Sequence, residues 1–197
     1  MNSGDARTEI LRSIRAHLAA SASFDGLEPP IKIHPSKSPS SKPLAEVVEV
    51  FKRNLELVDG HCIIVQSEAE VEETVKRLTE GKKIASPNAS RSDLFAYDVG
   101  VTGAQAGIAE TGTLVLDSSV ERNRLVSLVP PVHIAILNAS QIYPTLGETL
   151  SALQSGEEVS PAITFITGPS RTADIEFTLA IGVHGPQELY VIINQNN

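Results

Sequence analysis

The chain has too few cysteines to build a cross-linked or cluster-bearing fold. Its 197 residues include one cysteine, Cys62, so no disulfide can form within the chain. A cysteine-ligated iron–sulfur cluster needs about four thiolates, which excludes a cluster held by this chain alone. Cys62 lies in the apolar run of residues 62–65, where we expect a small buried side chain in a strand.

The chain also lacks the features of nucleic-acid-binding and membrane proteins. Its net charge is −8, and its basic residues form nothing larger than pairs such as Lys82 and Lys83, whereas a phosphate backbone requires a concentrated basic face. No apolar run approaches the ~20 residues that span a bilayer, and the N-terminus lacks the apolar stretch of a signal peptide. We therefore expect a cytoplasmic protein that binds neither nucleic acid nor membranes. A small anion could still bind to a local backbone nest.

Several motifs that identify common enzymes are missing. The chain contains no P-loop, GxGxxG, HExxH, CxxC or GxSxG motif. Its five histidines show no metal-ligand spacing. We therefore expect no metal site, and P-loop, zinc and α/β-hydrolase chemistry are excluded.

The order of apolar patterns predicts one α/β domain preceded by an arm. An amphipathic helix is predicted at residues 6–20 within an N-terminal helical arm (residues 1–20), and the Pro/Ser-rich residues 21–43 are typical of a linker. Helical and strand-like segments alternate through the domain, residues 44–197. The predicted strands are residues 62–65, 84–85, 113–116, 132–137, 163–167 and 189–193. The predicted helices are residues 44–58, 67–78 and 140–153.

This alternation predicts the layers of the fold. Continuous apolar strands between helices are typical of a mostly parallel sheet that is covered on both faces, so we expect a three-layer α/β/α domain. In such sheets ligands bind beyond the carboxyl ends of the strands. The functional site is therefore expected on loops that follow strands.

A segment of small residues, residues 101–113, carries the first candidate site. Small residues let a backbone approach a ligand closely. Glu110 is the one carboxylate in the segment, and it is a candidate catalytic group as a nucleophile, a general base or a ligand-positioning group. A Gly-rich hairpin whose glutamate is solvated, or pairs with a structural arginine, explains the same residues. The candidate ligand-binding residues are Thr102, Gly103, Thr111, Gly112 and Thr113.

A second segment, residues 166–176, is predicted as a strand, a tight turn and the start of a helix. Free amides at a helix N-terminus, together with Arg171, would bind an anion. Asp174 is a candidate catalytic group, but with Glu176 it would weaken anion binding, and a simple helix cap explains the segment equally well. The candidate ligand-binding residues are Gly168, Ser170, Arg171 and Thr172.

Two histidines are interpreted differently. His184 lies in the Gly-rich turn of residues 182–186, where it has little to pack against, and it is a candidate catalytic residue. His133 begins an apolar run, and there a hydrogen-bonded structural histidine is the expected interpretation.

Together, five ordered segments resemble the LUD-domain family, and within it the lactate-utilisation protein C branch: residues 102–104, 108–116, 127–135, 167–176 and 182–186. The resemblance runs from about residue 44 to the C-terminus. It implies a fold similar to the ribose-5-phosphate isomerase, glucosamine-6-phosphate deaminase and CoA-transferase group. It also implies a place in a three-component system that oxidises L-lactate to pyruvate, in which two partner proteins carry the iron–sulfur clusters and this chain binds no cofactor. The family does not assign catalytic residues.

Three functions are therefore considered. The first is an accessory or ligand-binding subunit that acts with iron–sulfur partner proteins and binds a small anionic ligand. The second is a stand-alone enzyme that uses Glu110 on a small anionic acyl, CoA or sugar-phosphate substrate. The third is a ligand-sensing module, and a homodimer is considered for each of the three. The accessory function predicts no turnover by the isolated chain and co-elution with cluster-bearing partners.

Overall fold

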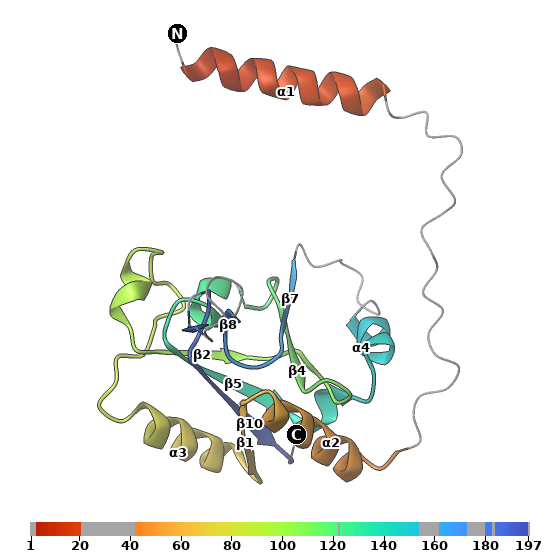
Figure 1. Ribbon diagram of the computed structural model, residues 1–197, viewed down its shortest axis with the longest axis vertical. Coiled ribbons are helices and arrows are strands. Elements are labelled where there is room, and N and C mark those ends of the chain that lie inside the picture. The colour runs from red at the N-terminus through yellow and green to blue at the C-terminus, as the bar shows by residue number, and fades with distance from the viewer. Residues whose placement is uncertain are drawn as a thin grey trace. The chain divides into compact units, whose positions relative to one another are not determined.

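The structure is a computed structural model (Figure 1). It describes residues 3–20, 42–121, 123–153, 162–172, 180–182 and 184–196. The chain divides into two compact units, residues 1–34 and residues 35–197. Each unit is therefore described by itself.

The described part of the first unit is helix α1 (Ser3–Ala20), which confirms the helix predicted there. The side chains of Ile10, Leu11 and Ile14 are 59%, 42% and 49% exposed. Within this unit, these three apolar side chains are therefore not packed.

The core of the second unit is a four-stranded parallel sheet. Its strands lie in the order β1 (His61–Val65), β10 (Glu188–Asn194), β5 (Val132–Asn138) and β2 (Val99–Gly103). Val65, Asn194 and Asn138 lie opposite one another in the register. Because the strands are parallel, the carboxyl ends of β1, β10 and β5 meet at one edge of the sheet.

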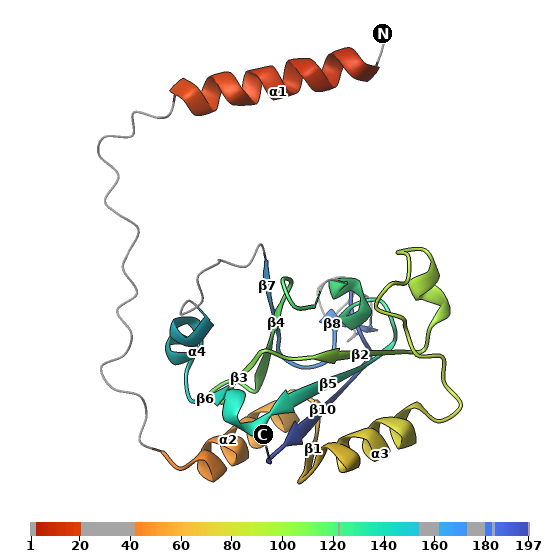
Figure 2. The same cartoon turned by 180° about the vertical axis from the view of Figure 1, so that it is seen from behind.

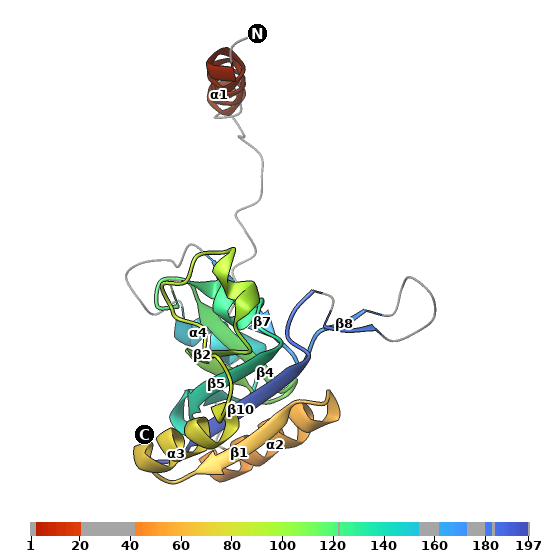
Figure 3. The ribbon, with the colours of Figure 1, turned by 90° about the vertical axis from the view of Figure 1, so that its left-hand side faces the viewer.

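Helices cover both faces of this sheet. Helix α2 (Leu44–Leu57) buries Phe51 and Leu55 against one face, and α3 (Glu68–Thr79) packs Val71 against the other. In Figure 3, β1 lies between the two helices. This arrangement confirms the predicted α/β class, a mostly parallel sheet between helices.

A second sheet packs beside the first. Its order is β6 (Ile142–Tyr143), β3 (Ala106–Ile108), β4 (Thr113–Asp117) and β7 (Ile163–Ile166). Its β3–β4 and β4–β7 pairs are antiparallel. Leu114 and Leu116 join the core around α2, and Leu153 of α4 (Leu146–Leu153) packs on the other side. A separate hairpin consists of β8 (Arg171–Thr172) and β9 (Ala180–Ile181).

Local signals explain where the elements begin and end. The Ser67 hydroxyl accepts a hydrogen bond from the Glu70 N–H, and Gly81 has a φ of 71° after the end of α3. The hydroxyl of Ser67 thus caps the start of this helix, and a glycine in the left-handed region follows its end. Single-turn helices are η2 (Asp93–Ala96), η3 (Arg124–Ser127) and η4 (Ala139–Gln141).

Among the described residues, no helix is both long and apolar enough to cross a membrane.

Two predicted elements are wrong in part. The helix predicted at residues 140–153 begins only at Leu146, because Pro144 lacks an amide hydrogen and favours an extended Tyr143 before it. The preceding residues form η4 and β6 instead. The strand predicted at residues 84–85 is reduced to a single parallel bridge between Ile84 and Val99.

Candidate functional site

Glu110 lies in the turn that joins β3 to β4. Ile108 pairs with Thr113, so residues 109–112 form the turn. The Glu110 side chain is exposed, and its Oε1 accepts a hydrogen bond of 2.8 Å from the backbone N–H of Leu146, the first residue of α4. A carboxylate is stabilising there, because the first amides of a helix lack intrahelical partners and carry partial positive charge. Glu110 thus has a partner other than solvent or an arginine.

A pocket of about 290 Å³ opens beside Glu110. Valine, alanine and proline side chains form much of its wall, with one carboxylate and one ammonium group among them. The described residues that line it are Lys42, Val47, Val50, Ala109, Glu110, Pro144 and Thr145. Ligand pockets usually measure about 300–1,000 Å³, so this pocket suits a small ligand. The Lys42 Nζ atom also lies 3.6 Å from Oε1 of Glu46.

Helix α2 holds the turn that carries Glu110. The Asn54 side-chain amide donates a hydrogen bond of 2.8 Å to the carbonyl oxygen of Ala109. Gly112 has a φ of 63°, and a Cβ atom at this position would lie 2.2 Å from the backbone nitrogen of Leu55. Close packing on α2 is therefore sufficient to explain Gly112.

Threonine hydroxyls connect the first segment to the second. Oγ1 of Thr113 lies 2.7 Å from Oγ1 of Thr111 and 2.7 Å from Oγ1 of Thr167. Thr113 is buried, while Thr111 and Thr167 are exposed. The chain of hydroxyls links the β3–β4 turn to the end of β7.

A helix that begins at Arg171, as one interpretation of the second segment predicted, is not found, and residues 173–176 of this segment lie outside the described residues. Arg171 and Thr172 form strand β8, which pairs with β9. The backbone of Ser170 explains this, because its N–H donates to the Pro186 carbonyl and its carbonyl accepts from the Gly182 N–H. The anion site expected there therefore has no helix N-terminus at Arg171–Thr172.

Of the two charged candidates in the second segment, the structure describes only Arg171. The Arg171 guanidinium forms an ion pair with Asp59, directly after α2. Arg171 therefore already has an anionic partner within the protein. Asp174 lies outside the described residues.

The third segment meets the second at Ser170. His184 is exposed, and its backbone N–H donates a hydrogen bond of 3.3 Å to the Ser170 hydroxyl. The structure thus gathers Thr111, Thr113, Gly168, Ser170, Arg171 and His184 into one linked region. Glu110, in the same turn as Thr111, accepts a hydrogen bond from α4 and lines the pocket.

Thr102 and Gly103 belong to a different environment. Oγ1 of Thr102 lies 2.9 Å from Nε2 of His133, which is fully buried. Burial lowers the pKa of His133 to about 4, so the imidazole is neutral near pH 7. The hydrogen-bonded structural histidine is confirmed. The backbone N–H of Gly103 donates to Oε1 of Glu121 at 2.8 Å.

Metal-ligating groups are dispersed in the part of the chain that the structure describes. Within it, no three His, Cys, Asp or Glu residues are grouped so that they could hold a metal ion. Burial raises the pKa of the Cys62 thiol to about 12. A thiol with so high a pKa is a poor nucleophile and a poor ligand.

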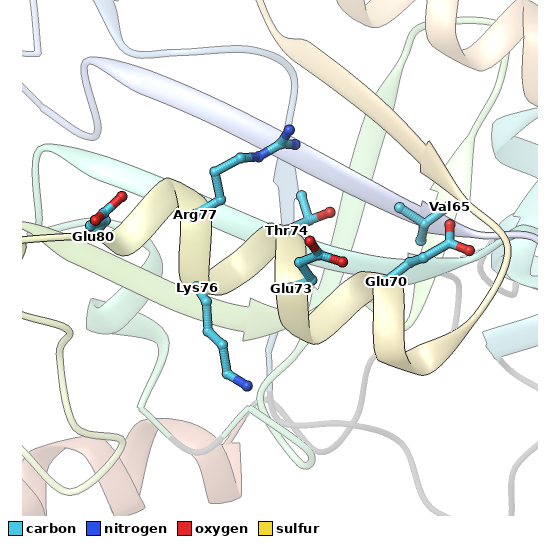
Figure 4. A pocket seen from close by; sticks show the side chains of 7 residues that line it. All are labelled: Val65, Glu70, Glu73, Thr74, Lys76, Arg77 and Glu80. Carbon is cyan, nitrogen blue, oxygen red and sulfur yellow. The ribbon is translucent and has the colours of Figure 1, made fainter.

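A pocket of about 660 Å³ lies along α3, away from the predicted segments. Figure 4 shows charged side chains that extend from the helix in several directions. Oε2 of Glu70 accepts a hydrogen bond from the Gln66 N–H. The described lining residues are Val65, Glu70, Glu73, Thr74, Lys76, Arg77 and Glu80. This lining is the polar face of an amphipathic helix, and we assign it no ligand.

Sequence reasoning missed the residues that α2 and its flanks contribute. Lys42 lines the pocket, Asn54 holds the turn, and Asp59 pairs with Arg171. Each lies more than 40 residues from the segment concerned. The one local signal was Asn54, a poor helix former in the last turn of α2.

Comparison with known proteins places these segments in a family. The model of the LUD domain matches residues 85–194, a range that contains all three candidate segments. An uncharacterised protein of Neisseria meningitidis is 47% identical over 96 residues, which are 48% of this chain and 41% of the relative. Lactate utilization protein C of Bacillus licheniformis is 39% identical over 130 residues, 61% of this chain and 54% of the relative. The chain spans about half the length of the curated relatives it matches.

A solved structure shares the fold. The crystal structure of a DUF162 family protein from Deinococcus radiodurans superposes with a TM-score of 0.61 at 23% identity. The match covers 77% of this chain and 98% of that one. At this identity the likeness concerns the fold alone. Because the family model covers more than half of the residues, the chain belongs to the LUD-domain family.

Proposed function

We propose that this chain is a ligand-binding accessory component of a lactate-utilisation system and acts with partner proteins that carry iron–sulfur clusters. Relatives named lactate utilization protein C, 36–42% identical over about half of the chain, support the pathway. The observation that carries the ligand-binding part is the pocket whose lining combines Glu110 and Lys42 with apolar residues.

The pocket favours a small ligand that is partly apolar and partly polar. Val47 and Val50 offer contacts to an aliphatic group, and the Lys42 ammonium group, shared with Glu46, is the positive charge among the described lining residues. The Glu110 carboxylate accepts hydrogen bonds, so it favours a ligand with a hydroxyl donor. A small hydroxylated anion meets all three requirements.

The thiol chemistry of the chain supports the proposed division of labour. Cluster ligation needs several thiolates, and the single cysteine has a pKa of about 12. Electron transfer is therefore assigned to the partner proteins, and binding of the small anionic ligand to this chain.

A second candidate function is a stand-alone enzyme with Glu110 as its nucleophile. The observation in its favour is that the exposed Glu110 carboxylate lines a pocket. Such an enzyme would turn over a small acyl, CoA or sugar-phosphate substrate without partners.

Purification and complementation test the proposal. A strain that lacks this gene should fail to grow on L-lactate and recover when the wild-type chain is supplied. The tagged chain should co-elute with proteins that contain iron and absorb visible light, and the isolated chain should show no turnover. Growth of the deletion strain on L-lactate would refute the pathway, and turnover by the isolated chain would favour the enzyme.

A further inference from the structure

We propose a second binding site, at the carboxyl ends of β1, β10 and β5, that takes a small neutral ligand in which a primary carboxamide is attached to an apolar body. The pocket at this site shares no described lining residue with the pocket beside Glu110, so the proposal does not depend on the proposed function. Figure 2 shows the ends of β5 and β10 beside α2.

The connectivity creates a crevice at this edge. After β1 the chain continues into α3 on one face of the sheet, and after β5 it continues into η4 and β6 toward the other face. Chain segments that leave the strands of a parallel sheet toward opposite faces open a crevice at its carboxyl edge, and parallel sheets bind ligands at such positions. Here β10 lies between the two departing segments.

A pocket of about 240 Å³ occupies this crevice. Gln66, Gln195 and Ala139 each follow directly after one of the three strands, and α2 supplies the opposite side. Val48 and Ala139 are each 1% exposed and form an apolar floor. The described lining residues, all uncharged, are Leu44, Ala45, Val48, Gln66, Ala139 and Gln195.

The two glutamines present a defined hydrogen-bonding edge. Nε2 of Gln66 donates a hydrogen bond of 2.6 Å to Oε1 of Gln195. That bond leaves Oε1 of Gln66 as an acceptor and Nε2 of Gln195 as a donor, neither of them bonded within the described residues. If both amides are turned over, the unbonded oxygen and the unbonded nitrogen exchange residues, and the pair still presents one atom of each kind.

This edge selects the chemical class of the ligand. A primary carboxamide offers one carbonyl acceptor and an N–H donor side by side, which match the free donor of Gln195 and the free acceptor of Gln66. A carboxylate of the same shape has no donor and would leave the Gln66 oxygen facing an anion. The apolar floor favours a flat hydrocarbon body attached to the amide.

Benzamide and benzoate test the proposal, because they share a ring and differ in the group that meets the glutamines. In 1H–15N NMR spectra of the full chain, benzamide should produce saturable shifts at residues 44–48, 66, 139 and 195. Benzoate should bind about tenfold more weakly, and Gln195→Glu should weaken benzamide binding by about tenfold. Gln187→Glu is the matched control, because Gln187 is exposed and precedes β10 at its other end.

Three results would overturn the site. These are no benzamide shifts at these residues, equal binding of benzoate, or unchanged benzamide binding by Gln195→Glu. If that variant fails to fold, which its spectrum reports directly, Gln195→Met removes the same donor without adding charge. Complementation on L-lactate is a separate measurement, so failure here leaves the proposed function standing.

Discussion

Replacing Glu110 separates the two roles that the structure gives to its carboxylate, at the N-terminus of α4 and in the pocket. Glu110→Gln keeps an oxygen that can accept the Leu146 N–H and removes the charge. The loss of a charge at a helix N-terminus costs about 0.3–1 kcal/mol. Glu110→Ala removes the acceptor as well, and loss of a capping acceptor costs about 0.5–2 kcal/mol. For a chain of this size, 1 kcal/mol shifts the melting temperature by about 2–4 °C.

Glu148 provides a matched control for the charge. It lies in the first turn of α4, as an acidic residue that the described lining of the pocket does not include. Glu148→Gln should therefore lower the melting temperature by a similar few degrees. If Glu110 contacts a ligand, Glu110→Gln should abolish growth on L-lactate in a strain that lacks this gene, whereas Glu148→Gln should support growth.

Thermal denaturation followed by circular dichroism, together with growth curves, decides between the roles. Normal growth with Glu110→Gln would reduce Glu110 to a helix cap and refute a chemical role. A fall of more than about 10 °C with Glu110→Gln would contradict the magnitude worked out here, since the retained hydrogen bond should preserve α4.

Three further predictions concern stability and reactivity. Gly112→Ala should lower the free energy of unfolding by about 2–5 kcal/mol in urea titrations, because the new Cβ meets the backbone of α2 in a left-handed turn. Cys62 should react with a disulfide reagent at pH 8 far more slowly than in the unfolded chain, because raising its pKa from 9.0 to about 12 lowers the thiolate fraction about a thousandfold. Burial lowers the pKa of His133 from 6.5 to about 4, so stability is lost as the pH falls through this range. About 2 kcal/mol should be lost between pH 7 and pH 5, and His133→Gln should remove this contribution to the pH dependence. A fast Cys62 reaction, or an unchanged slope for His133→Gln, would contradict the burial of these groups.

The parts of the fold with strong local patterns were predictable. The continuous apolar runs gave β1, β5 and β10 within a residue or two, and the serine and glutamate around residue 67 gave the start of α3. The short strands β2 and β3 were missed, because glycine and alanine make their sequences resemble a loop. The pairing partners in the second sheet depend on contacts between distant segments, which periodicity does not encode.

The candidate site was predictable as a set of segments but not as an arrangement. Glu110 was identified from its small neighbours, yet its hydrogen bond to Leu146 depends on Pro144 delaying the start of α4. Arg171 was assigned to a ligand because its partner, Asp59, is more than 100 residues away. The local sequence identified the candidate side chains, but contacts between distant segments determine the hydrogen-bond or ion-pair partner of each one.

The position of β10 inside the parallel sheet has a consequence for how the chain is made. Gln66 and Gln195, which meet at the ends of β1 and β10, are 129 residues apart. During synthesis, β1 has no neighbouring strand until residues 188–194 have left the ribosome, since β10 separates it from β5. Strand β1 therefore lacks its pairing partner through most of translation, and such long-range pairing is slow to form. A nascent chain of this kind is expected to depend on chaperones, and a chain shortened before β10 is expected to aggregate rather than fold.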